Sequence, residues 1–432
     1  MKQIELLKKA VEEAEEKNKI KLLNTDGVKK IFEIVESFIK NNKGICYGGT
    51  AINNILPLKD QFYKPHDIPD YDFFSKTPME DAIKLCDIYY KSGFQHVEAK
   101  SGLHAGTYKV FVDFIPVADI TFIESKFFDN IIKECIKKGG ILYAPPNFLR
   151  MAMYVELSRP DGDVSRWEKV FIRLELLNKY YPIKEKCVSA SPSPQNSTLF
   201  KTLLKTFSKN NVVFFGGYAL SMYSELFLNA LTFFDVISIN AKKVADESVD
   251  QLQKLNIHAS VVVHEEVSGY IGKSYEITVD KRPVAFIYEP IACYNYNTVV
   301  KNGIKINIAT TDTMLSFYFM FLYINEDYET NRIICMCRDI IKLQEKNEKL
   351  MKRFTLNCIG TQKTQRDIFF EKDLLFQKYK NNKSNKNFTD AFFRYKPDEK
   401  LDKPRKTKHR PKQRFKQSRK HTKRNVFDIL KY

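Results

Sequence analysis

The chain has 432 residues, 44% of them hydrophobic, so it can bury substantial cores and should form two domains or more. Its net charge of +18 indicates a polyanionic partner, and charge alone leaves nucleic acid and anionic membrane both open. The N-terminal residues do not resemble a signal peptide, and the longest apolar run, Met314–Ile324, is too short to cross a bilayer, so we expect a soluble intracellular protein. The eight cysteines include no Cys-x-x-Cys pair, which predicts neither a disulfide framework nor a zinc site.

Residues 1–42 have the apolar spacing of helices and lead into a glycine-rich stretch, Gly44–Asn53. There a short apolar strand precedes Gly48 and Gly49, and a helix is predicted to begin at Thr50. The glycines let the backbone turn and approach a ligand, and the free N–H groups of the helix start favour an anion. The Thr50 hydroxyl can add a donor. The stretch therefore predicts a phosphate site, although a simple tight turn would have the same sequence.

Two acids follow about twenty residues later. Asp70 and Asp72 stand two positions apart in a run of strand-forming residues, so both carboxylates should project from one face of a strand. Adjacent carboxylates repel each other unless a cation lies between them, and Mg²⁺ prefers such oxygen ligands. Two ions about 3.5–4 Å apart can hold the attacking and leaving oxygens of a phosphoryl displacement. Taken alone, the pair could also be solvated.

A third acid comes from residues 107–121, which predict one long strand interrupted near Pro116. The candidates are Asp113 and Asp119. Two helices should follow, the first ending near Ser158 and the second beginning near Ser165. The second carries Arg166 and Lys169, which are candidate contacts for a triphosphate; the alternative is a solvated helix face.

The order Gly-Gly-Thr, then Asp-x-Asp on the next strand, resembles the signature of the polymerase-β-like nucleotidyltransferases. Residues 44–75 and 107–170 further resemble the poly(A) polymerase catalytic subunits of large cytoplasmic DNA viruses, and the resemblance extends over roughly residues 30–320. It implies an α/β (α+β) fold and a template-independent poly(A) polymerase that adds AMP from ATP to an RNA 3′ end by two-metal-ion nucleotidyl transfer.

The site residues that we predict on this basis fall into two groups. Asp70, Asp72 and Asp119 are the catalytic acids and the ligands of Mg²⁺ or Mn²⁺. The nucleotide-binding residues are Gly48, Gly49, Thr50, Arg166 and Lys169.

The second half of the chain repeats the first. The residues around Gly216 match those around Gly48, the residues after Asp235 match those after Asp72, and the stretch containing Asp280 matches that containing Asp113, with offsets of 168, 163 and 167. The chain therefore predicts two tandem nucleotidyltransferase-like domains.

The comparison of the two copies also distinguishes the acids predicted to be catalytic from the one predicted to be structural. The second copy has Phe233 in place of Asp70, Tyr218 in place of Thr50 and Phe286 in place of Asp119. Such a copy cannot hold two metal ions and is degenerate. Asp113 is retained as Asp280 and is predicted to be structural, whereas Asp119 is lost together with Asp70. We therefore predict that Asp119 is the third catalytic acid.

The predicted domains are a catalytic domain with N-terminal helices at 1–186, a Ser/Pro-rich linker at 187–197, the degenerate domain at 198–380 and a basic tail at 381–432. Residues 400–424 of the tail contain thirteen lysines and arginines and one acid, Asp402. With so few apolar residues, this stretch should stay disordered until it meets phosphate. A nuclear localisation signal is the competing interpretation.

Other functions remain open at this stage. A terminal uridylyltransferase, a CCA-adding enzyme or a 2′–5′ oligonucleotide synthase would use the same acids. A non-catalytic RNA-binding protein is disfavoured because the first copy retains every acid that the second has lost. The resemblance implies RNA and ATP as partners, no membrane, and either a homodimer or a separate processivity subunit. It implies a location in the host cytoplasm, at the viral factory, and in the virion, with the nucleus less favoured.

The tail gives the first prediction. Deletion of residues 400–432 should weaken binding of an RNA primer and flatten its salt dependence, because each single-strand phosphate contact contributes about 0.7 log units of affinity per log unit of salt. Products should also become shorter, while addition of the first nucleotide at saturating primer changes little. Salt titrations of primer affinity and product lengths under a competitor trap measure both effects. Equal slopes and equal lengths for the two proteins would favour the localisation signal.

Overall fold

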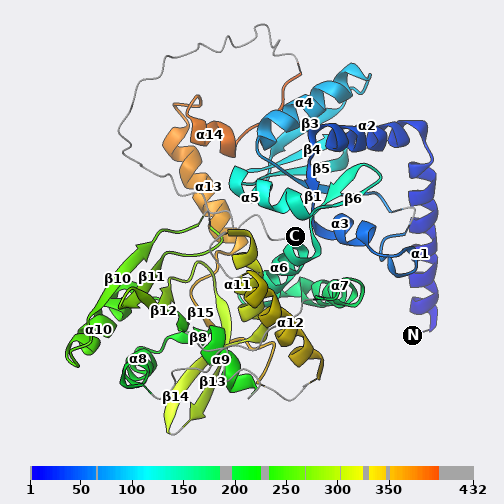
Figure 1. Ribbon diagram of the computed structural model, residues 1–432. Coiled ribbons are helices and arrows are strands. Elements are labelled where there is room, and N and C mark those ends of the chain that lie inside the picture. Colours follow the sequence, from blue (N-terminus) through cyan, green and yellow to red (C-terminus); the bar gives the residue numbers. More distant parts are fainter. Residues whose placement is uncertain are drawn as a thin grey trace.

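The structure is a computed structural model. It describes residues 2–64, 67–184, 197–224, 233–267, 269–301, 303–324, 330–346 and 351–397. Two β-sheets lie at opposite ends of the molecule, and four helices lie between them: α6 (Pro146–Leu157), α7 (Trp167–Tyr180), α11 (Thr311–Ile324) and α12 (Thr330–Lys346) (Figure 1). The predicted linker, apart from Ser197, and the basic stretch 400–432 lie outside the described residues.

The first sheet, as far as it is described, has seven strands in the order β3-β4-β5-β2-β1-β7-β6. Their bounds are β1 (Ile45–Cys46), β2 (Tyr71–Ser75), β3 (Val97–Ser101), β4 (Thr107–Val112), β5 (Ile115–Phe122), β6 (Ile136–Lys138) and β7 (Ile141–Tyr143). β2 runs parallel to β5 and antiparallel to β1. All five residues of β2 are buried, since the sheet is covered on both faces.

Helices and short 3-10 turns connect and cover these strands. They are α1 (Lys2–Leu23), α2 (Asp26–Asn42), α3 (Gly48–Ile55), η1 (Leu58–Asp60), α4 (Pro78–Lys91), α5 (Ser125–Ile131), η2 (Ile132–Glu134) and η3 (Val164–Arg166). The predicted N-terminal helices and the helix before Ser158 are confirmed. No helix among the described residues combines the length and the apolar character needed to cross a bilayer.

The second sheet has the order β10-β11-β12-β9-β8-β14-β13-β15. Its elements are α8 (Thr198–Lys209), β8 (Val213–Phe215), α9 (Gly216–Tyr223), β9 (Phe234–Ile237), α10 (Ala241–Gln253), β10 (Ala259–His264), β11 (Ser274–Val279), β12 (Arg282–Tyr288), β13 (Tyr294–Lys301), β14 (Ile304–Ala309) and β15 (Cys358–Ile359). The first seven strands of this order repeat the order of the first sheet, with the parallel pair β9–β12 equivalent to β2–β5, and β15 is an additional strand beside β13. The two tandem copies predicted from the sequence are thus confirmed by topology.

The stretch predicted as one long strand is instead a hairpin. Asp113 and Phe114 have φ angles of 48° and 65°, and this left-handed pair turns the chain from β4 into β5. Asp280 and Lys281 make the same turn in the second copy, with φ angles of 50° and 63°. Aspartate tolerates this region better than most residues, which explains why it occurs in both turns. The predicted interruption at Pro116 is confirmed as a register shift.

The chain returns to the first sheet after the second copy. Helices α13 (Gln365–Tyr379) and α14 (Lys386–Ala391) lead to a segment that pairs with the edge strand β3. The Ser101 N–H donates to the Phe393 carbonyl at 3.1 Å, and the Tyr395 N–H donates to the Ala99 carbonyl at 2.7 Å. An exposed edge is covered in this way. Residues 386–395, which the sequence grouped with the tail, are therefore part of the folded structure.

A disulfide joins Cys293, before β13, to Cys358 in β15. The cysteine spacing, from which we predicted no disulfide framework, gave no sign of this pair, because 65 residues separate the two cysteines and nothing in the local sequence marks them. Cys46, Cys86 and Cys337 are free and buried, as expected for core-filling thiols.

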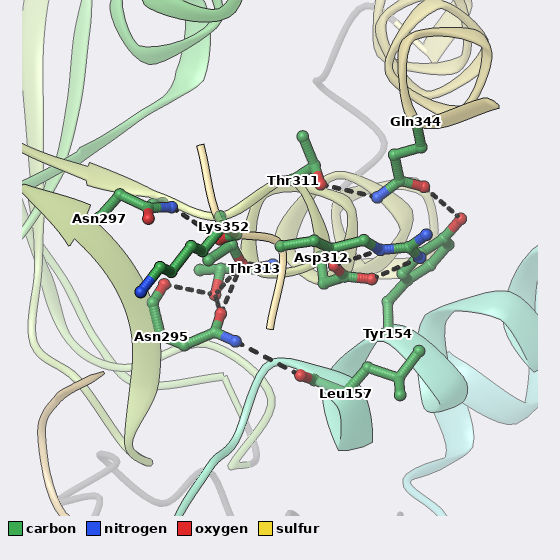
Figure 2. A network of polar contacts seen from close by, with 12 residues as sticks. Tyr154, Leu157, Asn295, Asn297, Thr311, Asp312, Thr313, Gln344 and Lys352 are labelled. Atoms are coloured by element: carbon green, nitrogen blue, oxygen red, sulfur yellow. Dashed lines mark hydrogen bonds and ion pairs between the residues drawn. The ribbon is translucent and has the colours of Figure 1, made fainter. Parts of the chain in front are cut away.

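A buried polar network joins the two halves (Figure 2). The Asn295 side chain donates to the Leu157 carbonyl at the end of α6, and accepts from the Thr313 hydroxyl at the start of α11. Asp312, with no exposed surface, accepts two hydrogen bonds from the Arg353 guanidinium at 2.7 and 2.8 Å. Such bidentate pairs are directional, so this one fixes the start of α11 within the second half, while the bond from Asn295 to Leu157 crosses to the first half.

Replacement of Asp312 by Ala should lower the free energy of unfolding by about 3 kcal/mol, because Arg353 would keep a largely buried charge with no counter-ion from Asp312. The matched control is Asp246→Ala, which removes the exposed pair with Lys242 and should cost less than about 1 kcal/mol. Urea unfolding measures both values. Similar losses for the two variants would contradict the structural role of the buried pair.

Candidate active site

The glycine-rich stretch forms the turn from β1 into α3. Gly48 has a φ of 71°, and a Cβ atom there would lie 2.8 Å from Oδ2 of Asp72, so only glycine fits. The helix begins at Gly48, two residues before the predicted start at Thr50. The Thr50 hydroxyl donates to the Asp70 carbonyl at 2.6 Å. Thr50 therefore ties the helix to the entry of β2 in this structure.

The three predicted acids lie together at one end of β2 and β5. Asp72 and Asp119 are directly opposite each other in the parallel register of these strands, and both are buried. Asp70, two residues earlier than Asp72, immediately precedes β2 and is exposed. Asp113 lies in the β4–β5 turn instead, also exposed. The structure thus brings together Asp70, Asp72 and Asp119 and leaves Asp113 apart.

The surroundings of Asp70 and Asp72 oppose the ionisation of these two carboxyl groups, as the directions of their pKa values show. Burial raises the pKa of Asp72 well above its usual value, and the charges of Asp70 and Asp119 raise it further. Partial burial and then the charge of Asp119 raise the pKa of Asp70. Lys109 lowers both pKa values, with help from Arg166 at Asp72 and from Lys169 at Asp70. A cation among the acids would therefore be bound favourably.

The donor set fits a hard divalent cation. Oδ1 of Asp72 is buried and accepts no hydrogen bond from any residue that the structure describes. Carboxylate oxygens from three acids are ligands that Mg²⁺ and Mn²⁺ prefer, and the exposed Asp70 leaves the site open on one side. Asp70, Asp72 and Asp119 are the residues that would hold such an ion.

Lys109 was not found from the sequence. It lies on β4 opposite Asp119, and its ammonium group forms an ion pair with Oδ2 of that acid. Its equivalent in the second copy is Glu276, opposite Phe286. A lysine that alternates with apolar residues on a strand gives little signal, but the loss of both Lys109 and Asp119 in the repeat could have shown that they form a pair.

Basic residues of η3 and α7 lie near the acids. Arg166 pairs with Glu156 at 3.2 Å, and Lys169 lies within electrostatic reach of Asp70. Partial burial and the charges of Arg173 and Arg166 lower the pKa of Lys169. These cations repel one another, so an anion between them would be stabilised. The structure places both predicted basic residues at the site and adds Arg173.

Arg173 also reaches the start of α3. Its guanidinium lies 4.5 Å from the centre of the Phe62 ring and donates to the Tyr63 hydroxyl at 3.1 Å. A Cβ atom on Gly49 would collide with the Tyr63 hydroxyl and lie 2.9 Å from Nη1 of Arg173. Tyr63 and Arg173 were missed because they are 110 residues apart and neither belongs to a motif.

Among the residues of the second copy that the structure describes, the equivalent positions do not form such a group of acids. Phe233 and Phe286 occupy the positions of Asp70 and Asp119, and their ring centres are 5.2 Å apart. Asp235 is opposite Phe286, as Asp72 is opposite Asp119. Burial raises the pKa of Asp235 to about 8, with the charge of Arg332 lowering it in part. An apolar contact thus stands in place of two of the three acids, while the strand register is unchanged.

Comparison with known proteins agrees with this geometry. Residues 33–163 match the model of the family described as Poly(A) polymerase catalytic subunit. A protein of Acanthamoeba polyphaga mimivirus, which carries the provisional name poly(A) polymerase catalytic subunit, is 27% identical over 68% of this chain and 58% of its own length. A protein of African swine fever virus with the same provisional name is 33% identical over 47% of this chain and 42% of its own length. The chain thus spans about half the length of these relatives.

The crystal structure of the Megavirus polyadenylate synthase superposes on this chain with a TM-score of 0.75. The match covers 91% of this chain and 86% of that one at 22% identity, and it confirms the fold. The family resemblance predicted from the motifs is confirmed by the match of residues 33–163.

Asp235 provides a test by pH. Its carboxyl should stay protonated in the folded protein up to a pH of about 8, whereas in the unfolded chain it ionises near 3.8. Between these values the folded state binds more protons, so stability should fall as the pH rises, by at most about 1.4 kcal/mol per pH unit. Asp235→Asn should flatten this dependence and stabilise the protein most near pH 8. Urea unfolding of the wild-type protein and of Asp235→Asn from pH 5 to pH 8 measures this dependence. Equal slopes of unfolding free energy against pH for the two proteins would show that Asp235 is ionised when folded.

Proposed function

Because residues 33–163 match the poly(A) polymerase catalytic subunit family, we propose that this chain is a template-independent poly(A) polymerase that transfers AMP from ATP to the 3′ end of RNA. The observation that carries the proposal is the group formed by Asp70, Asp72 and Asp119 at the paired strands β2 and β5. The second copy keeps only Asp235, the equivalent of Asp72, and has Phe233 and Phe286 in place of the other two acids. A merely structural group would not need Asp70 and Asp119 at positions where two aromatic rings suffice.

In the proposed reaction, Asp70, Asp72 and Asp119 hold two divalent cations. When bound, these ions neutralise charge on the triphosphate and make the RNA 3′-hydroxyl more acidic. Asp119 accepts the proton of that hydroxyl at a carboxylate oxygen. The 3′-oxygen then forms a bond to the α-phosphorus of ATP, and the bond from that phosphorus to pyrophosphate breaks. Lys109 balances the charge of Asp119 in the free protein.

The triphosphate would lie between the start of α3 and the start of α7. Gly48 and Gly49 allow the phosphates to approach the backbone N–H groups of α3, where the helix dipole favours negative charge. Arg166, Lys169 and Arg173 supply positive charge from the other side. Electrostatic contacts of this kind are the main source of catalysis in phosphoryl transfer.

The remaining parts of the proposal concern partners and location. RNA would be held by positive charge, including the basic stretch 400–424 outside the described residues. A homodimer or a processivity subunit, and a place in the host cytoplasm or the virion, are proposed from the family resemblance alone.

The direct test is a gel assay. Purified protein is incubated with a 5′-labelled RNA primer, Mg²⁺ or Mn²⁺, and each of the four nucleoside triphosphates in turn. Long products with ATP alone support the proposal. Preference for UTP would indicate a uridylyltransferase, addition of CCA a tRNA-repair enzyme, and products without a primer a 2′–5′ oligonucleotide synthase. No addition under any condition would favour an RNA-binding protein.

Asp72→Ala and Asp119→Ala should each lower the rate of adenylate addition by about 100-fold or more, since each removes a proposed ligand of the catalytic ions. Asp70→Ala should behave in the same way. The matched control is Asp113→Ala, which lies six residues from Asp119 in the exposed turn and should affect stability more than rate. Primer-extension rates at saturating ATP, with unfolding curves for each variant, measure this. An active Asp119→Ala beside a stable, inactive Asp113→Ala would reverse the choice of third acid.

A further inference from the structure

Helix α7 contacts the second half of the chain on a side that does not face the acids. Two of its rings, Trp167 and Phe171, pack against Phe354, with ring centres 5.9 Å apart in each case. Phe354 follows α12 and belongs to the segment that leads into β15. The positions of Trp167 and Phe171, four residues apart, put both rings on one stripe of the helix.

Arg353 connects this contact to the core of the second half. Its guanidinium lies 5.1 Å from the centre of the Phe171 ring and 5.2 Å from that of Phe354. The same group makes the bidentate pair with the buried Asp312 of α11. Burial alone would lower the pKa of Arg353, but the charge and hydrogen bonds of Asp312 raise it overall. The cation is therefore held firmly under α7.

The other anchors of α7 come from α6 and act at its two ends. The buried Arg150 donates to Asn178 at 2.7 Å and to the Leu177 carbonyl at 3.3 Å, which fixes the C-terminal end. At the N-terminal end, the Trp167 indole donates to the Glu156 carbonyl at 3.1 Å. Between these anchors, the rings of the N-terminal half rest on Phe354.

That N-terminal half carries the basic residues of the site. Arg166, Lys169 and Arg173 recur at spacings of three and four, so they share a stripe distinct from that of Trp167 and Phe171. A small rotation of the helix would move all three cations relative to the acids. Catalysis at a phosphate requires precisely placed groups. The position of these cations must therefore be fixed by contacts on the stripe of α7 that carries Trp167 and Phe171.

We propose that Phe354 and Arg353 are positioning residues for nucleotide binding: they hold α7 so that Arg166, Lys169 and Arg173 face the triphosphate. The inference rests on the proposed function, in which these cations bind ATP. It gives the second copy a role in the reaction although it has lost its acids. The copy acts through the segment 353–354 as a support for the first copy's phosphate site.

The test is Phe354→Ala in the full-length protein. The KM for ATP should rise by about three- to tenfold, as expected for the loss of two aromatic contacts, while kcat at saturating ATP changes little. Phe354→Trp should restore most of the affinity. The matched control is Leu356→Ala, an exposed residue of the same segment, which should leave KM unchanged.

A second readout does not depend on activity. Trp167 is the only tryptophan in the chain, so acrylamide quenching of its fluorescence reports directly on the seating of α7. Quenching should increase in Phe354→Ala and stay unchanged in Leu356→Ala. ATP affinity is measured in parallel by calorimetry, and melting curves show whether each variant is folded.

The possible outcomes distinguish a failure of the proposed function from a failure of the positioning role of Arg353 and Phe354. If wild-type protein extends no primer, the proposed function fails; a loss of ATP affinity in Phe354→Ala would still support the role of the segment. If wild-type protein is active but Phe354→Ala keeps its KM and its quenching, the positioning role is wrong. A fall in kcat and melting temperature together, without a change in KM, would also overturn it and leave Phe354 as a packing residue.

Discussion

The parallel pairing of β2 with β5 is the constraint on which the site depends. It holds Asp72 opposite Asp119 in a buried position, with Asp70 two residues away. Carboxylates held so close repel one another, and burial adds to the cost of their charge. The neighbouring features reduce that cost: Lys109 on the adjacent strand, the cations of α7, and an open side where a divalent ion fits. The need to offset the negative charge of these three acids thus accounts for the basic residues on the elements around them.

The second copy has the same fold without a group of three neighbouring carboxylates. Its strands pair in the same order and register, yet the equivalent positions hold the contacting rings of Phe233 and Phe286. The sheet therefore does not need acids to be stable, which separates fold from function within one chain. Asp235 alone remains, and burial keeps it protonated at neutral pH.

The contact between the halves is polar where orientation matters. Asn295 is buried and donates to the Leu157 carbonyl of the first half, and within the second half it is held by Thr313, next to the buried Asp312 that pairs with Arg353. Hydrophobic packing alone would tolerate small rotations of α6 against α11. A network of hydrogen bonds with fixed geometry does not tolerate such rotations. The second half lacks the equivalents of Asp70 and Asp119. It can therefore influence the active site of the first half through its contacts with α6 and α7.

The sequence by itself determined the repeat and the glycine turn, because both are written in local patterns. It also predicted Asp70 and Asp72 from their spacing on one strand, and Asp119 because its equivalent is lost in the second copy together with that of Asp70. It also located Arg166 and Lys169. Only the tertiary structure decided the partners of these residues. Lys109, Tyr63, Arg173 and the Cys293–Cys358 disulfide are joined to their contacts by pairing and packing between distant segments. The hairpin at Asp113 was misread as a strand because two residues in left-handed conformation leave no trace in the alternation of apolar side chains.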